Sequence, residues 1–585
     1  MKSLRHLVFW LTVLLAWSTA AQAPLPKPPP LVIGTMAGEF VFDPALAYRT
    51  WDMHLNSALF ETLLILGDDG VTLESGVAKA WEVSNDGLVY TFHLRKNAKW
   101  SDGKPVLADH FASGWFRALM PDTESDYAWL HYAIKGAVEL RDQRQAFIQQ
   151  WIDKDENAPN KLIFQNWKQL REGYTKSVWA EDDHTLKVRL GRANSSFPYL
   201  LVNPAFAPQP GRMMEHRFDL MINFAGRTRI SSAFFSDPER AVYNGPYRLE
   251  RWPEKGGDLH LVANGRYWNS ESVASKKIHV RVFDDQQALL KAYDQQEIDW
   301  IPTIGSSPVV EKMVREKRSD VHRTAHAGTY YYEFNCRAKI DDKDNPYADP
   351  KLRRAIAHLF DREAMASIAS TYHSPMRTLV PPSTMPGYEP AEDSAARFDV
   401  DLAKQLLQEA GYDDLGKLGP LVLLINEESS HVEMAQPLIK QLKAVGFDVR
   451  LETPDFRIFL ERATAGDFHL RRAGWYADYH DPSSFLDLYA PWSDTDSGYD
   501  SEAFGKQYIA ALRSPDHDSR MQRMAQAESI LLKEAGCVPV SQYHHISLYD
   551  PDRIRLSESA WRPSRWDRVR KLNHGVALGS AWLSR

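Results

Sequence analysis

The clearest hydrophobic pattern of the chain lies in its last third. LVLLI, which begins at Leu421, is an apolar run typical of a buried strand, and FDVRLE further on is a second strand-like run. Between the two runs, apolar residues recur at helical spacing, at Val432, Leu438, Leu442 and Val445. Ser429 or Ser430 can cap this helix and Gly446 can end it. The segment therefore predicts a β–α–β unit with parallel strands and a right-handed crossover.

Shorter patterns predict further elements. Residues 89–95 alternate between polar and apolar positions, which is typical of a half-buried strand, and Asp-Gly pairs supply turns on either side. The charged, glutamine-rich residues 135–175 predict surface helices with a break at Ala158-Pro159. Strands are also predicted within LVIGTMAG (31–38), NGPYRLERW (244–252) and GTYYYEFN (328–335), an amphipathic segment at SALFETLLIL (57–66) and a helix at DLAKQLLQEAGY (401–412).

Length and composition bound the class of protein. With 585 residues the chain is too long for one hydrophobic core, so we expect two to four lobes. Apolar residues make up 44% and charged residues 25%, which is ordinary for a folded soluble protein. The formal net charge of -7 gives no basic footprint for nucleic acid, so we expect no nucleic-acid partner.

The N-terminus has the order of a secretory signal peptide. Lys2 and Arg5 give a basic start, an apolar run extends from Leu7 to Trp17, and small residues follow from Ser18. We expect residues 1–21 to be removed, with cleavage after Ala20 or Ala21. Because no cysteine follows the apolar run, no lipid anchor is expected there. This pattern predicts a soluble exported protein, most simply of the bacterial periplasm.

The chain has two cysteines, Cys336 and Cys537. Export permits one disulfide between them, whereas two buried thiols fit the same sequence, because a core of this size does not need a disulfide. The sequence leaves this choice open.

No catalytic set stands above background. The chain lacks a G-x-S-x-G elbow, a phosphate-binding G-x-x-x-x-G-K-[ST] loop and an H-E-x-x-H helix. His544 and His545 are adjacent on an expected strand and so point to opposite faces, which is a poor metal chelate. Turn and helix-start positions account for Asp86, Asp102 and Asp109 as capping residues. We therefore expect no enzyme activity, no metal and no cofactor.

The segment GWYADYHDPSSF places Asp478 among aromatic residues. A carboxylate in such surroundings is costly to desolvate unless it meets a cation or several donors. Together with Arg472, six residues earlier, it could hold the two ends of a zwitterion. Aromatic residues also gather at 127–132 and 330–332, and such clusters fit either a core or a ligand pocket.

His431 lies where the first strand of the β–α–β unit gives way to its helix. In open α/β sheets ligands bind outside the carboxyl ends of the strands, and a helix N-terminus there favours anions. A surface histidine beside a helix cap fits the same spacing.

Seven short motifs occur in the order found in one family: YTFHLRKNAKWSDG, NGPYRL, RYWN, TYYYEFN, LRRAIAHLFDRE, AGWYADYHDPSSF and VPV. Through them, over nearly the whole mature chain, the sequence resembles the peptide-binding proteins of bacterial ATP-binding-cassette (ABC) importers, of the oligopeptide and murein-peptide type. The resemblance implies an α/β clamshell of the type II periplasmic binding proteins, with two lobes, a hinge of crossing strands and an extra domain. It implies domain I at 22–73, 212–328 and 537–585, domain II at 74–211 with an insertion at about 135–175, and domain III at 329–536.

The resemblance also implies the site residues. Asp478 would pair with the amino group of a peptide, and Arg472 and His431 would bind its carboxylate. Main-chain pairing would involve Gly474, Trp475 and Tyr476, the facing lobe would contribute Glu61, Thr62 and Leu63, and Tyr331 and Glu333 would line the pocket.

The chain departs from the family at several positions. The resemblance implies two further basic residues for the carboxylates of the shortest ligands, and Ala463 and Ser370 stand at the matching positions, so we expect poor dipeptide binding and a preference for about three to five residues. Gly328 and Tyr476 stand where the relatives have a disulfide, and the 135–175 segment is longer than theirs. That segment is interpreted as a surface embellishment.

The resemblance implies capture of short peptides and their delivery to an inner-membrane ABC permease by a monomeric binding protein. A dedicated receptor for murein tripeptide or for a signalling peptide is the alternative within the same fold. An exported peptidase and a periplasmic chaperone are alternatives of other classes.

Overall fold

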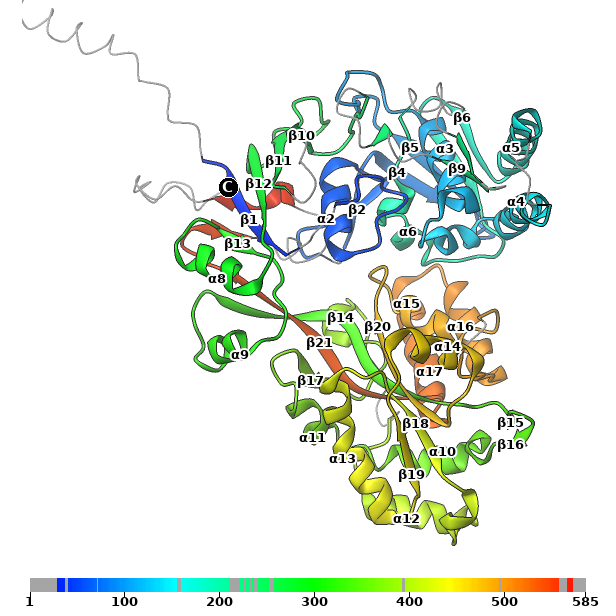
Figure 1. Ribbon diagram of the computed structural model, residues 1–585. Helices are drawn as coiled ribbons and strands as arrows, with labels where there is room; N and C mark the ends of the chain where they lie inside the picture. The colour runs from blue at the N-terminus through cyan, green and yellow to red at the C-terminus, as the bar shows by residue number, and fades with distance from the viewer. Residues whose placement is uncertain are drawn as a thin grey trace, which may run out of the picture.

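The structure is a computed structural model with two lobes (Figure 1). It describes residues 29–571 except 37–39, 71, 155–158, 211–220, 225–226, 231–233, 236–239, 252–256, 392–394, 494–495 and 557–565. The predicted signal peptide, residues 1–21, lies outside the described residues. Two long strands, β14 (Val321–Phe334) and β21 (Cys537–Tyr549), run from one lobe to the other.

The first lobe contains most of the N-terminal half of the chain. Tyr90, Phe92 and Leu94 of β5 are buried while the residues between them are not, so the alternation predicted for this strand is confirmed. The main elements of this lobe are β1 (Leu31–Thr35), α2 (Thr50–Leu59), β2 (Leu64–Leu66), β3 (Leu73–Ser75), β4 (Ala78–Val83), β5 (Val89–Leu94), α3 (Ala108–Leu119), α4 (Ala137–Ile152), α5 (Asn160–Tyr174), β6 (Val178–Asp182), β7 (Thr185–Arg189), α6 (Phe197–Leu200), β8 (Met221–Phe224), β9 (Arg227–Ile230), β10 (Tyr247–Arg251), β11 (Leu259–Ala263), β12 (Lys277–Val282), α8 (Gln286–Asp294), β13 (Trp300–Ile301), α9 (Pro308–Arg315), β22 (Ile554–Arg555) and β23 (Arg570–Lys571).

The second lobe contains the β–α–β unit that the sequence predicts. Strands β18 and β19 pair in parallel, from Leu421 opposite Val449 onward, and α13 connects them. Gly446 ends the helix with a positive φ, as predicted, but neither serine caps its start: the N-cap is Glu428, without a side-chain cap. The main elements of this lobe are α10 (Pro350–Ala357), α11 (Arg362–Ser367), β17 (His373–Pro375), α12 (Val400–Glu409), β18 (Leu421–Leu424), α13 (Ser429–Val445), β19 (Val449–Glu452), α14 (Phe456–Ala465), β20 (Leu470–Tyr476), α15 (Ser483–Leu486), α16 (Glu502–Leu512) and α17 (His517–Lys533).

One mixed sheet continues through both lobes, in the order β10-β11-β12-β1-β13-β21-β14-β20-β18-β19. The N-terminal half of β14 pairs with the end of β21 beside the first lobe, and its C-terminal half, from Gly328, pairs with β20 in the second lobe. The lobes are therefore linked by hydrogen-bonded strands rather than by irregular chain.

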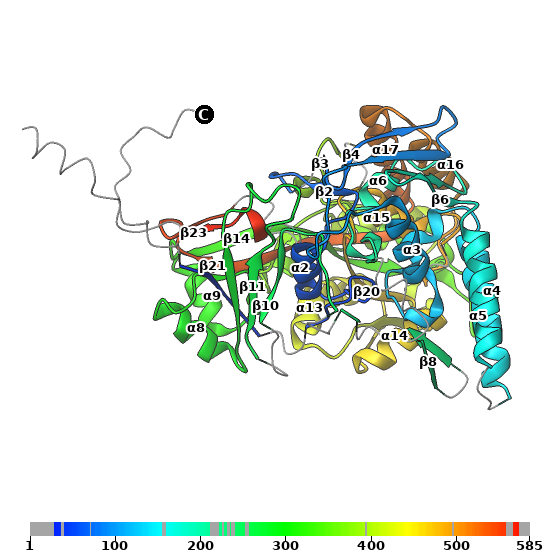
Figure 2. The same cartoon turned by 90° about the horizontal axis from the view of Figure 1, so that it is seen from above.

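One segment differs from the local patterns, a second is longer than predicted, and a third agrees with the prediction. The amphipathic segment 57–66 is not one element, because α2 ends at Leu59 and β2 begins at Leu64. The predicted strand 328–335 is the second half of the longer β14. The helices predicted in 135–175 are present as α4 and α5, which lie side by side at the edge of the first lobe (Figure 2), and Pro159 precedes α5.

Both cysteines are free thiols. They pack with the same cluster of apolar residues in the second lobe, and burial raises the pKa of Cys336 to about 11 and that of Cys537 as well. The structure thus has no disulfide between them: Cys537 is a buried thiol and Cys336 a partly buried one.

The segment GWYADYHDPSSF lies where the lobes touch. Tyr479, which follows β20 of the second lobe, is buried in the apolar core of the first lobe. Nearby, Arg520 of α17 forms an ion pair with Asp481 at 2.6 Å and donates to the hydroxyl of Ser196, 2.9 Å away, from the first lobe. The Ser196 hydroxyl in turn donates to Asp481 at 3.0 Å, so the contact closes as a triangle across the lobes.

We predict that Asp481→Ala destabilises the protein by roughly 3–5 kcal/mol, because it leaves the buried Arg520 charge without its partner. The side chains of Asp481 and Arg520 are only 1% and 3% exposed. Thermal unfolding followed by calorimetry measures the loss. Glu461→Ala is the matched control, because its ion pair with Arg457 is exposed and should contribute about 1 kcal/mol or less. Equal effects of the two substitutions would contradict the prediction.

Candidate functional site

Strand β20 organises the candidate site in the second lobe. Because side chains alternate along a strand, Arg472, Gly474 and Tyr476 share one face. β18 runs parallel to β20, so the carboxyl ends of both strands and the start of α13 meet at one edge of the sheet. Asp478 follows β20 by two residues. The structure thus brings Arg472 and His431 together directly and places Asp478 further along the same strand direction.

Asp478 is a carboxylate without a cation in the described part of the chain. Its backbone N–H donates to the Ser484 hydroxyl at 3.0 Å, and its side chain accepts a hydrogen bond from Tyr127 of the first lobe. Its Oδ2 atom is buried and has no hydrogen-bond partner among the described residues. Burial raises the pKa of Asp478 to about 6, with the Tyr127 hydrogen bond acting in the opposite direction. At neutral pH the group is therefore ionised and lacks a counter-ion.

Arg472 and His431 form the second charged position. The Nη2 atom of Arg472 lies 2.8 Å from Nε2 of His431. A guanidinium only donates, so this imidazole nitrogen accepts and the ring is neutral. Burial, and then the Arg472 charge, lower the pKa of His431 to about 4. Among the described atoms, the Arg472 Nε and the His431 Nδ1 are buried and have no hydrogen-bond partner, so both can still donate.

Two glycines, Gly328 and Gly474, lie against aromatic side chains on this face. A Cβ atom there would lie 2.5 Å from the hydroxyl oxygen of Tyr543, and one at Gly328 would lie 2.7 Å from the Tyr476 ring. The rings of Tyr476 and Tyr543 stack at 4.6 Å between their centroids. Both glycines therefore make room for this aromatic pair. Gly328 and Tyr476 are also directly opposite each other in the β14–β20 ladder.

Glu61, Thr62 and Leu63 lie together in the first lobe. The Glu61 carboxylate accepts from Trp268 Nε1 at 2.5 Å and from the Tyr267 hydroxyl. Backbone carbonyls of this segment already accept hydrogen bonds from Asn244 and from residues 76–78. The Glu61 N–H is engaged as well, because it donates to Asn244 Oδ1 at 3.2 Å.

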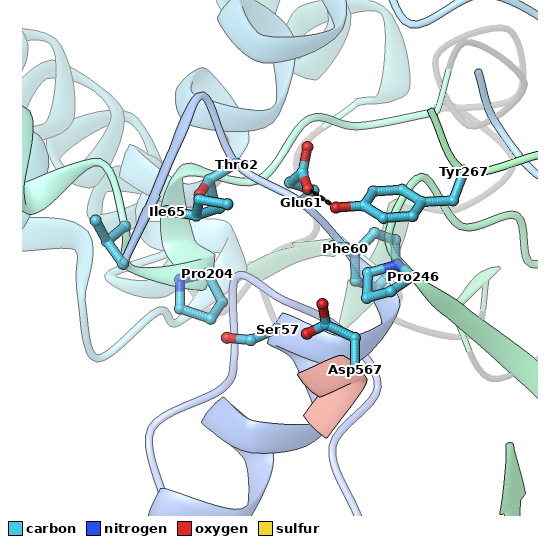
Figure 3. Close-up of a pocket in the computed structure, with 10 residues that line it drawn as sticks. Ser57, Phe60, Glu61, Thr62, Ile65, Pro204, Pro246, Tyr267 and Asp567 are labelled. Atoms are coloured by element: carbon cyan, nitrogen blue, oxygen red, sulfur yellow. Dashed lines mark hydrogen bonds between the residues drawn. The ribbon is translucent and has the colours of Figure 1, made fainter. Parts of the chain in front are cut away.

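A pocket with an empty volume of about 400 Å³ opens beside this segment (Figure 3). It lies within the first lobe and does not include Asp478, Arg472 or His431. This pocket therefore does not join the two halves of the predicted site. The pocket is lined by Ser57, Phe60, Glu61, Thr62, Ile65, Val202, Pro204, Pro246, Tyr267 and Asp567.

Glu333 and Tyr331 lie on the other face of β14 from the Arg472 site. The Glu333 carboxylate accepts from Arg471 Nε at 2.9 Å and from the Tyr489 hydroxyl at 2.5 Å. Tyr331 is buried in the apolar cluster beneath that face. The structure therefore separates these two residues from Arg472 and His431. Trp475 is on this second face as well, packed beside the same cluster.

Tyr127 is the residue that sequence reasoning missed. It precedes a 3-10 turn in the first lobe, Ala128–Ala133, and its hydroxyl meets Asp478 of the second lobe. Its aromatic neighbourhood is visible in the sequence, but nothing local pairs it with Asp478.

Among the described residues, no group of three or more His, Cys, Asp or Glu side chains is arranged to hold a metal ion. No helix in the same part of the chain has the length and apolar character needed to cross a bilayer.

Two α/β lobes, linked by two strands and carrying an unpaired carboxylate and an available guanidinium near their contact, define a two-lobed ligand-binding protein. The model of the family described as "Bacterial extracellular solute-binding proteins, family 5 Middle" matches residues 72–497. The chain belongs to this family of extracellular solute-binding proteins.

Curated relatives cover most of the chain. The periplasmic oligopeptide-binding protein OppA of Escherichia coli is 30% identical over 86% of this chain and 84% of its own length. The periplasmic murein peptide-binding protein MppA of Escherichia coli is 29% identical and covers 87% of both chains.

Solved structures share the fold. The unliganded open form of the murein tripeptide-binding protein MppA is 26% identical, with a TM-score of 0.75, over 94% of this chain and 98% of its own. A second structure of MppA, from Escherichia coli, gives a TM-score of 0.66 over 94% of this chain and 100% of its own.

We predict that Tyr127→Phe raises the pKa of Asp478 above its value of about 6, because the hydroxyl that stabilises the ionised carboxylate is lost. A ¹³C NMR titration of the aspartate side-chain carboxyl carbons measures the shift, and Asp478→Asn identifies the resonance by removing it. Tyr132→Phe, an exposed tyrosine on the same turn, is the control and should leave the resonance unchanged. An unchanged pKa in Tyr127→Phe would refute the contact.

Proposed function

We propose that this protein captures short peptides between its lobes and delivers them to an inner-membrane ABC permease. The observation that carries the proposal is Asp478, a buried, ionised carboxylate with an unmet acceptor and no cation among the described residues. The α-amino group of a peptide supplies both the positive charge and the hydrogen-bond donors. Relatives of the chain are named as oligopeptide-binding and murein peptide-binding proteins, which supports the same class of ligand.

Arg472 and His431 are proposed to bind the opposite end of the peptide. Both retain unused donors, and a terminal carboxylate is the natural acceptor for a guanidinium. Six residues separate Arg472 from Asp478, a rise of about 20 Å along an extended chain. After the reach of both side chains is subtracted, the remaining distance suits an extended peptide of about three to five residues.

The other parts of the proposed binding site follow the family resemblance. Gly474, Trp475 and Tyr476 would pair with the ligand backbone by strand addition, and Glu61, Thr62 and Leu63 would approach from the first lobe when the lobes close. Tyr331 and Glu333 are kept as proposed pocket residues, although their present contacts are with the second lobe's own interior.

The cellular setting is proposed on the same basis. We propose a periplasmic protein exported by a cleavable signal peptide at residues 1–21, without a lipid anchor and without catalytic activity. It would act as a monomer, with no cofactor and no nucleic-acid partner. The three-domain division, with domain II at 74–211 and domain III at 329–536, also remains a proposal.

We predict that denaturing the purified protein releases a mixture of short peptides with free amino groups, and that Asp478→Asn releases none. The substitution removes the charge but keeps the shape, so the amino group loses its ion-pair partner. Mass spectrometry identifies the released ligands. Asp487→Asn is the matched control. The Asp487 carboxylate accepts hydrogen bonds from the Tyr479 and Tyr508 hydroxyls, and the variant should still release peptides.

A single released species would instead indicate a dedicated receptor, for murein tripeptide or a signalling peptide. Recovery of the same mixture from Asp478→Asn would overturn the role assigned to this carboxylate. Binding of N-acetylated peptides as tight as that of free-amine peptides would do so as well.

We further predict that trialanine binds at least about tenfold more tightly than dialanine, a difference of about 1.4 kcal/mol in binding free energy. The reason is that Ala463 and Ser370 stand where the relatives are expected to have basic residues for the shortest ligands. Isothermal titration calorimetry measures both affinities. Ala463→Arg should selectively improve dialanine binding, whereas equal affinities in the unmodified protein would rule out the length preference.

A further inference from the structure

Glu428 stands directly beside the proposed carboxylate position. It is the N-cap residue of α13, three residues before His431, and one of its carboxylate oxygens lies 3.3 Å from His431 Nε2. Its other oxygen accepts a hydrogen bond from the Ser430 hydroxyl at 2.9 Å. Because Nε2 accepts from Arg472 and carries no hydrogen, it does not donate to this carboxylate, and only the Ser430 hydrogen bond holds the side chain, which is 62% exposed. A carboxylate of the protein therefore stands beside the proposed carboxylate position.

The same imidazole nitrogen of His431 also receives the Arg472 guanidinium at 2.8 Å. Arg472 and Glu428 thus lie beside the same imidazole nitrogen, and a ligand carboxylate bound at Arg472 would stand close to the Glu428 carboxylate. A neutral imidazole adds no positive charge, so one arginine would have to serve two carboxylates. Two neighbouring carboxylates repel each other, and the free-energy cost of that repulsion falls when a cation lies between or beside them.

We infer that Glu428 is a specificity-determining residue that favours peptides whose last residue is basic. This inference rests on the proposed function, with the peptide carboxylate at Arg472 and His431. An ammonium or guanidinium group on the last side chain can fold back toward the exposed Glu428 carboxylate. It would then neutralise the Glu428 charge, which otherwise repels the terminal carboxylate of the peptide.

The chain offers a matched control in the preceding residue. Glu427 is also exposed, and its backbone N–H donates to the Pro454 carbonyl at 3.0 Å. Among the described residues, its carboxylate forms no hydrogen bond or ion pair with His431 or Arg472. Glu428→Gln and Glu427→Gln therefore change the net charge equally at adjacent positions, and only the first removes the charge beside the site.

Calorimetry with Ala-Ala-Lys, Ala-Ala-Gln and Ala-Ala-Glu, at low ionic strength and neutral pH, tests the inference. In the unmodified protein we expect Ala-Ala-Lys to bind about fivefold more tightly than Ala-Ala-Gln, which is the scale of a partly exposed ion pair, and Ala-Ala-Glu to bind most weakly. Glu428→Gln should bring the three affinities close together and tighten Ala-Ala-Gln, whereas Glu427→Gln should preserve the unmodified order.

The failure of the Glu428 inference and the failure of the proposed function give different results. If all three peptides bind the unmodified protein equally well, or if Glu428→Gln keeps their order, the specificity role of Glu428 is overturned while peptide binding stands. If none of the three binds and N-acetylation makes no difference, the proposed function itself fails.

Discussion

The structure depends on a carboxylate that the fold removes from water without supplying a cation. Taking an ionised group out of water is costly, and the hydrogen bonds from Tyr127 and from the backbone of Asp478 itself offset only part of that cost, because burial still raises the pKa of Asp478 to about 6. A protein selected for stability alone would gain from replacing such a group. Its position at the contact between two lobes is therefore best understood as a site whose counter-ion is brought by a ligand.

The contact between the lobes places this carboxylate. Strands β14 and β21 set the distance between the lobes, and the loop after β20 inserts Tyr479 into the core of the first lobe. The triangle of Asp481, Arg520 and Ser196 then fixes that loop. Because Asp478 follows β20 and touches Tyr127 of the opposite lobe, its surroundings change whenever the lobes move. Ligand charge and lobe position are physically coupled at this residue.

The sequence predicted what depends on local order. The β–α–β unit, the half-buried β5 and the helices of residues 135–175 all follow from periodicity and end signals, and the structure has each of them. Contacts between distant segments leave no such signal. Neither the Tyr127 contact with Asp478 nor the engagement of Glu333 by Arg471 could be found from spacing. The prediction that a serine caps α13 was wrong. The N-cap residue is Glu428, and the Ser430 hydroxyl donates to the Glu428 side chain instead of capping the helix.

The two ends of the proposed peptide site differ in the charged groups that a ligand would contact, and this difference affects which peptides are selected. At Asp478 no described cation competes, so the site gains from any free amino group that reaches it, whatever side chain follows. At the other end of the proposed site, His431 Nε2 lies near both the Arg472 guanidinium and the Glu428 carboxylate. A ligand carboxylate that pairs with Arg472 would therefore lose part of the gain to repulsion from Glu428. In the proposed binding mode, the amino end would therefore supply affinity common to all peptides, and the carboxyl end would distinguish among them.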